Sequence, residues 1–269
     1  MWIARLLPEG TKRYKSASNT FRAMDRIMDY KPMQWFAPWV MFAAGVGWRK
    51  AVSDRFYFWD FSGWEIGVGI TVIITIIIAW ALKNQEMMPI DNQLNNPRRG
   101  FLVYSVLGIF LFLIGWAGNP IVGMKIGLPY YLVLIGTYVM FLIPMEKDGG
   151  DAYHITDHKK RIVYSAISLL FSLIAVYIGF LQDEPVISTS AMVYAPFAAV
   201  SLIAPHARHV RRARLYSVFI YGFFISMRAP WLLVMMFVHY HGLRFYNYFR
   251  HGTVLPTLII EAKEDMNQT

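Results

Sequence analysis

The chain has 269 residues, of which 56% are hydrophobic and only 16% are charged, against roughly 25% charged in an average soluble domain. An ordinary soluble domain is therefore excluded, because the chain has too little polar surface to face water. The net charge is +9. The chain has no cysteine, which excludes disulfides, thiolate metal sites and a cysteine nucleophile. Long apolar blocks alternate with short charged stretches and no composition shift marks a linker, so we expect one continuous helical bundle.

The first segment, residues 1–32, is basic and lacks the apolar core of a cleavable signal peptide. We expect it to be a cytoplasmic segment that lies on the membrane. Residues 33–247 are expected to form the transmembrane bundle, and residues 248–269 a polar C-terminal tail.

Seven apolar blocks approach the length of about 20 residues that a membrane span needs. The last block contains Arg228-Ala229-Pro230, and since proline kinks or breaks a helix, this block is either one broken helix or two short ones. The predicted fold is therefore all-α, a polytopic transmembrane helical bundle of about seven spans, or eight if the last block is divided. The blocks are Met33–Trp48, Ile66–Leu82, Phe101–Gly118, Leu128–Met145, Val163–Leu181, Val186–Pro205 and Leu215–Tyr240.

The distribution of lysine and arginine predicts the orientation, because cytoplasmic loops retain these residues. The N-terminal segment and the loops 83–100, 146–162 and 206–214 carry eighteen of them, and the intervening loops carry four. The N-terminus is thus expected on the cytoplasmic side of a bacterial or archaeal cytoplasmic or intracytoplasmic membrane. The positive charge then reflects this bias and attraction to anionic lipid. Membrane lipids are expected partners, and nucleic acid is not.

The loop after the second block holds the most distinctive pattern. Its members are Asn84, Gln85, Met88, Asn92, Asn95, Pro97 and Arg99. This pattern resembles the first signature of the UbiA superfamily of intramembrane prenyltransferases. That signature reads Asn-Asp-x-x-Asp-x-x-x-Asp, followed by Asn-x-Pro and an arginine. Gln85, Met88 and Asn92 stand where the family has its aspartates, so the frame is present and the carboxylates are not.

Three further segments resemble the same family. Asp148 and Asp151 resemble its second aspartate signature, with the spacing one residue short, and residues 30–38 and 244–256 resemble its first-helix start and its ending. The family has a further helix pair between its two signatures, which this chain lacks. The resemblance therefore implies a degenerate member with an altered bundle.

The lost carboxylates bear on activity. Prenyl transfer ionises an allylic diphosphate, whose charge is normally neutralised by magnesium held on carboxylates. Amides and a methionine cannot hold that ion, and losing such stabilisation costs several kcal/mol of transition-state energy. We expect the activity to be lost. If the chain is an enzyme, the resemblance implies a magnesium-dependent prenyltransferase that uses Asn84, Asp91, Asp148 and Asp151.

Other residues are candidates for binding a ligand or a partner. Arg228 is the one charge deep inside an apolar block, and an intramembrane charge usually faces the protein interior, a cavity or a partner. His239 is a candidate ligand for haem or chlorophyll, and Asn95 and Arg99 belong to the retained signature. Pigment, quinone and isoprenoid lipid are candidate ligands, no cofactor is assigned, and no metal site is expected. A retinal pigment is excluded because Leu215–Tyr240 has no lysine for a Schiff base.

Three functions stay open. The favoured one is an integral membrane subunit or assembly scaffold of a larger membrane complex, such as one that bears pigments, quinones or haem, and it reuses a degenerate prenyltransferase-like bundle. Other membrane subunits are its expected partners, and the aromatic loop 55–64 suits either docking against such a subunit or lying in the headgroup layer. The second is an active isoprenoid-diphosphate-dependent prenyltransferase. The third is a transporter in which Arg228 is the substrate or gating residue, although other intramembrane charges are scarce.

Overall fold

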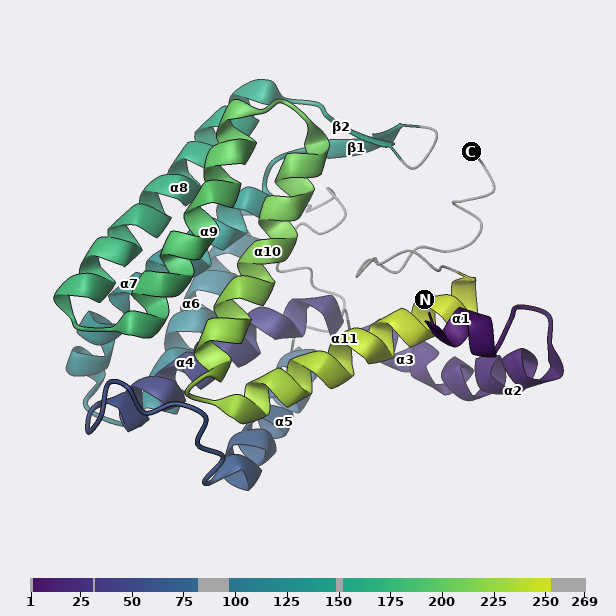
Figure 1. The fold of residues 1–269 in the computed structure, drawn as a ribbon, viewed down its shortest axis with the longest axis horizontal. Coiled ribbons are helices and arrows are strands. Elements are labelled where there is room, and N and C mark those ends of the chain that lie inside the picture. The colour runs from purple at the N-terminus through teal and green to yellow at the C-terminus, as the bar shows by residue number, and fades with distance from the viewer. Residues whose placement is uncertain (1, 31, 82–96, 149–151, 253–269) are drawn as a thin grey trace.

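The computed structural model describes residues 2–30, 32–81, 97–148 and 152–252, and most of them are helical (Figure 1). Within these ranges the strands form a single two-stranded hairpin. The elements are α1 Trp2–Leu6, α2 Lys12–Phe21, η1 Arg22–Met24, α3 Asp25–Met28, η2 Pro32–Trp35, α4 Phe36–Ala51, α5 Trp64–Ala81, α6 Pro97–Trp116, α7 Pro120–Phe141, β1 Met145–Asp148, β2 Ala152–Ile155, α8 His158–Leu181, α9 Pro185–Ile203, α10 Ala207–Ser226 and α11 Pro230–His251.

Five of the described helices, α5 to α9, are long and apolar enough to cross a membrane. The sequence prediction of an all-α membrane protein is confirmed at this level. The prediction of seven or eight spans stays a prediction, because length and composition identify five candidate spans among the described residues. Helix α4 has only 16 residues, α10 carries four arginines, and α11 is apolar only in its first half.

The last predicted block is two helices. Helix α10 ends at Ser226 and α11 begins at Pro230, so Arg228 lies in the turn between them. Proline suits the first turn of a helix, where its missing N–H has no partner to lose. The segment 206–214, predicted as a loop, instead forms the first turns of α10 after His206.

The fourth predicted block is displaced along the chain. Helix α7 begins at Pro120 rather than Leu128, because the Asn119 side chain accepts the backbone N–H of Ile121 at 2.9 Å and so caps the helix. Met145, predicted as the end of that span, belongs to β1. The hairpin β1–β2 thus joins α7 to α8.

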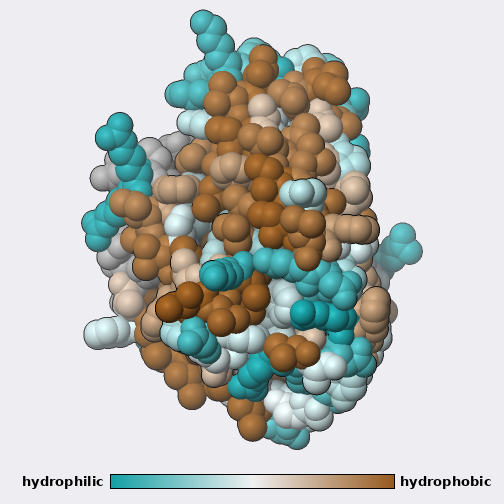
Figure 2. All heavy atoms as spheres, turned by 90° about the vertical axis from the view of Figure 1, so that its left-hand side faces the viewer, coloured by the Kyte–Doolittle hydropathy of each residue, from teal (hydrophilic) through white to brown (hydrophobic). Residues whose placement is uncertain are grey.

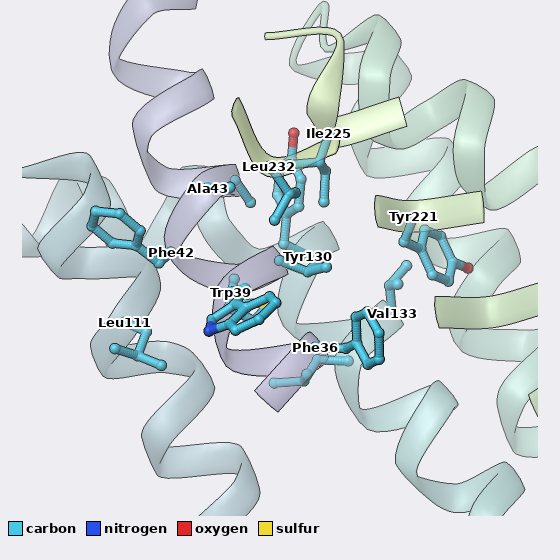
Figure 3. Packing of buried hydrophobic residues seen from close by; sticks show 14 of the residues in the cluster. Phe36, Trp39, Phe42, Ala43, Leu111, Tyr130, Val133, Tyr221, Ile225 and Leu232 are labelled. Atoms are coloured by element: carbon cyan, nitrogen blue, oxygen red, sulfur yellow. The ribbon is translucent and has the colours of Figure 1, made fainter. Parts of the chain in front are cut away.

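Helices α4 and α6 meet backbone to backbone. A Cβ atom on Gly45 would collide with the Phe112 carbonyl, and one on Gly115 would collide with the Phe42 carbonyl. Small residues at a helix interface permit such close approach, which favours association of helices in lipid. Around this contact, Figure 3 shows Phe36, Trp39 and Phe42 packing with residues of other helices, including Tyr130 and Leu232.

Helix α8 buries a stripe of small residues. The stripe is Ser165, Ser168, Ser172, Ala175 and Gly179, at alternating spacings of three and four. Hydroxyl contacts join it to α9, with Ser165 Oγ and Ser201 Oγ 2.9 Å apart and Ser168 Oγ 3.2 Å from the Tyr194 hydroxyl. Beyond the basic first turn, the rest of the α8 surface is mostly apolar and is exposed or partly exposed, as in a helix that faces lipid. Figure 2 shows the corresponding face of the bundle, where hydrophobic side chains gather between hydrophilic ones above and below.

Helix α11 runs obliquely away from the bundle of α6 to α10, and α1 to α3 lie along its C-terminal half (Figure 1). We call residues 2–28 the N-terminal clasp. Its Tyr14 and Phe21 pack against Tyr248 and Phe249 of α11. Asp25 forms a bidentate pair with Arg250, at 2.9 and 2.7 Å.

The alternating helices give the bundle two ends. One, the hairpin end, carries β1–β2 and the starts of α8 and α10. The other, the Glu184 end, carries the segment 52–63, the turn 182–184 and the turn at Arg228. In the predicted orientation, the hairpin end is cytoplasmic.

Candidate functional sites

The residues of the signature-like loops are mostly outside the described ranges. Asn84, Asp91, Asn95 and Asp151 belong to this group. Asp148 ends β1, and Arg99 lies exposed in the first turn of α6. The convergence of these residues on one cavity stays a prediction. Over the part of the chain that the structure describes, no group of three or more histidine, aspartate or glutamate residues is arranged to hold a metal ion.

Arg228 is paired inside the protein. Its Nη1 atom donates to both carboxylate oxygens of Glu184, at 2.7 and 2.6 Å, and both side chains are buried. Glu184 also accepts a hydrogen bond of 3.0 Å from the Tyr130 hydroxyl. Tyr130 belongs to α7, Glu184 directly precedes α9, and Arg228 lies between α10 and α11. Their bonds therefore connect four helices.

The same guanidinium holds the segment 52–63 against the bundle. Its Nη2 atom donates to the Arg55 carbonyl at 2.7 Å, and its Cζ atom lies 5.6 Å from the centre of the Phe58 ring. A Cβ atom on Gly47 would lie 3.1 Å from the Cβ of Arg228, so α4 packs directly on the arginine. The Trp59 N–H donates to the Met227 carbonyl at 2.7 Å, beside the same turn. We call Tyr130, Glu184 and Arg228 the Arg228 cluster, and its bonds hold the segment 52–63, α7 and the turns before α9 and α11 together.

Two more buried arginines lie at the hairpin end, and each closes the end of a helix. Arg161 Nη1 donates to the carbonyls of Ser201, Leu202 and Ala204, at 2.7, 3.0 and 3.0 Å, where α9 ends. Arg214 contacts the carbonyls of Met140, Phe141 and Ile143, where α7 ends.

The last carbonyls of a helix lack intrahelical partners and carry partial negative charge. The guanidinium of each buried arginine supplies both the donors and the compensating charge. These two arginines were counted as loop charges in the sequence analysis, and the structure places them inside the protein.

His239 sits in an aromatic cluster at the start of α4. Its ring stacks on Trp35, with centroids 5.5 Å apart, and meets the edges of Phe36 and Trp39. Its Nε2 atom lies 3.1 Å from the Pro32 carbonyl. This nitrogen is therefore hydrogen-bonded to the backbone, and ligation of haem or chlorophyll by His239 stays a prediction. The described contacts give His239 a role in holding η2 and α4 against α11.

Comparison with known proteins provides no relative, since no protein-family model, curated protein or solved structure matches the chain. The resemblance to the UbiA superfamily stays a prediction from the residues quoted above.

Sequence reasoning singled out Arg228 but missed its partner. Glu184 directly precedes Pro185, which begins α9, and in the sequence it is one of several acidic residues between blocks. A signal existed, because a buried arginine needs a carboxylate partner and the residue before a proline has a restricted backbone conformation. The choice among Asp183, Glu184 and the acidic residues of 54–65 needed the structure.

Proposed function

We propose that the chain is a non-catalytic subunit or assembly scaffold of a larger membrane complex, built on a bundle that resembles a degenerate UbiA prenyltransferase. One observation carries this proposal. The described residues include four buried charged side chains, and each is bonded to other parts of the same protein. They are Arg161, Glu184, Arg214 and Arg228.

Catalysis on a diphosphate and transport of a charged substrate both require charged groups that can exchange protein contacts for ligand contacts. Breaking a buried ion pair costs about 3–5 kcal/mol, and leaving a buried helix-end carbonyl without a donor costs about 1–3 kcal/mol. Groups held in this way suit a rigid framework. The amide and methionine side chains at Gln85, Met88 and Asn92 support the same proposal, since they are poor ligands for magnesium.

The segment 52–63 supports the proposed contact with other subunits. Its exposed aromatic side chains include Phe56, Trp59 and Phe61, with exposed fractions of 68%, 48% and 51%. The segment is held in place by the Arg228 cluster and by the pair between Lys50 Nζ and Asp60, at 3.0 Å. A rigid aromatic surface loses little conformational entropy when a partner binds, which favours docking. We place it outside the cytoplasm, with the N-terminus inside a bacterial or archaeal membrane.

The test is extraction of the native membrane in a mild detergent, followed by size analysis and by identification of the proteins, pigments and lipids that co-purify. We expect a large assembly of fixed stoichiometry. The double variant Phe56→Ser/Phe61→Ser should release the chain from it.

The matched control is Ile121→Ser/Val122→Ser, which removes two exposed apolar side chains beside the same end, at the start of α7, and should leave the assembly intact. Recovery of a monomer that consumes an isoprenoid diphosphate in the presence of magnesium would contradict the proposal and favour the enzyme. A monomer that moves a solute across proteoliposomes would favour the transporter.

A further inference from the structure

The N-terminal clasp has two unlike faces. The inner face packs on α11 through Tyr14, Phe21 and Asp25, as described above. The Tyr14 hydroxyl also donates to the Tyr248 carbonyl at 3.0 Å, and the Tyr248 hydroxyl donates to the Leu7 carbonyl at 2.7 Å. These bonds fix the clasp on the helix and so fix the direction in which its other face points.

The outer face is basic and carries apolar side chains. Six basic residues of the clasp are exposed, against one exposed acidic residue, Glu9, and a second, Asp29, directly after the clasp. The six are Arg5, Lys12, Arg13, Lys15, Arg22 and Arg26. Leu6 of α1 is also exposed, by 64%, although it is large and apolar. The Trp2 ring meets Phe245 of α11 edge-on, with centroids 6.2 Å apart, and is still 59% exposed.

We infer that this outer face binds the anionic headgroups of the membrane in which the bundle sits. Clustered lysine and arginine residues next to a membrane-spanning segment are attracted to anionic lipid. Tryptophan and leucine beside them insert into the boundary between headgroups and acyl chains. An acidic protein partner would need an apolar pocket for Trp2 and Leu6 beside its carboxylates, whereas an anionic bilayer offers charged headgroups and acyl chains side by side over its whole surface. The occupant that satisfies both features is a lipid surface.

The experiment uses the full chain, whose lack of cysteine allows a single label. Ser16 lies exposed on α2, on the face opposite Tyr14 and Phe21. The variant Ser16→Cys, carrying a polarity-sensitive fluorophore, is placed in nanodiscs of phosphatidylcholine alone or of phosphatidylcholine with phosphatidylglycerol. We expect a blue-shifted emission and several-fold protection from a water-soluble quencher only in the anionic nanodiscs, with both effects reversed by high salt.

Two charge variants separate this surface from a general charge effect. In the Ser16→Cys background, Lys12→Gln/Arg13→Gln/Lys15→Gln should abolish the shift. The matched variant Lys159→Gln/Arg208→Gln/Arg212→Gln removes the same charge from exposed positions at the hairpin end and should preserve it. Equal emission in the two lipids, or a shift that survives the first variant, would overturn the inference. A shift seen in neutral nanodiscs only after poly-glutamate is added would overturn it in favour of an acidic protein partner.

Discussion

Arginine has two structural uses inside this bundle. At the Glu184 end, Arg228 closes an ion pair between helices, and at the hairpin end Arg161 and Arg214 cap the last turns of neighbouring helices. The guanidinium suits both uses because it offers five donors in a rigid planar fork and stays charged when buried. Counting charges along the sequence predicts the side of the membrane for such residues but not whether their side chains turn inward.

The first prediction concerns the pair of Arg228 and Glu184. The variant Arg228→Met should destabilise the protein by about 3–5 kcal/mol, because it leaves the Glu184 carboxylate buried without its cation. The double variant Arg228→Met/Glu184→Leu should recover most of that loss, since no unpaired charge remains. Unfolding the detergent-solubilised protein with heat or denaturant measures the change in stability for both variants. Lys125→Met, at an exposed position near the same end, is the control and should change little. Equal losses in the single and double variants would contradict this account.

The second prediction concerns the caps of the helix ends. Arg214→Lys should cost about 1–3 kcal/mol, because a lysine ammonium lacks the fork that reaches the carbonyls of Met140, Phe141 and Ile143 together. Arg212→Lys, at the exposed position two residues earlier, should leave stability unchanged. Denaturant unfolding of the two variants decides between a capping role and a simple requirement for positive charge, which lysine would satisfy at both positions.

At the scale of elements, the sequence predicts which segments are apolar helices more reliably than where they begin. The block 163–181 lies inside α8, and 186–205 nearly coincides with α9, because both are bounded by strong polar or proline signals. The predicted start of α7 and the predicted loop over the first turns of α10 were wrong. Hydrophobicity does not reveal an asparagine cap, and it does not show that an arginine-rich segment is helical. The residues of the candidate site were likewise predicted only in part. Arg228 was found by its isolation in an apolar block, and Glu184 was missed because pairing depends on the arrangement of helices in space.

The third prediction tests how the helices pack. Gly45→Ala should destabilise the bundle strongly, by several kcal/mol, since its methyl group has no room against the α6 backbone near Phe112. Gly69→Ala is the matched control, because a Cβ atom there meets nothing within 4 Å on an exposed face of α5. It should be neutral or slightly stabilising, as alanine favours the helical conformation more than glycine does. Similar losses at the two positions would show that α4 and α6 are not in backbone contact.

At the scale of the whole molecule, the clasp joins segments that are far apart in the sequence. The hydrogen bonds from Arg250 hold the pKa of the Asp25 carboxyl below its ordinary value, against the opposing effect of burial. A carboxyl with a lowered pKa contributes to the folded state above its ordinary pKa, which is 3.8, and that contribution is lost as the pH falls below it. The docking of the clasp on α11 is therefore expected to weaken in acid and not between neutral pH and pH 5.

The fourth prediction measures this docking directly. Spin labels on the variants Asn19→Cys and Gly242→Cys, combined in the cysteine-free chain, report the distance between α2 and α11. We expect a narrow distance distribution at neutral pH that broadens below about pH 4. Asp25→Asn should broaden it already at neutral pH, whereas Asp29→Asn, at an exposed acidic position directly after the clasp, should keep the acid response of the parent. A narrow distribution in Asp25→Asn would show that aromatic packing alone holds the clasp.

The bonds between Asp25 and Arg250 span 225 positions of the chain, so the two partners leave the ribosome at very different times. Synthesis proceeds at roughly 5–20 residues per second, so the early partner waits at least about ten seconds for the late one. Throughout that interval Tyr14 and Phe21 lack the helix on which they finally pack, and the aromatic face is open to chaperones or to the lipid surface. Closure of the clasp is then a late event of folding, and it marks a chain in which α11 has been made and placed.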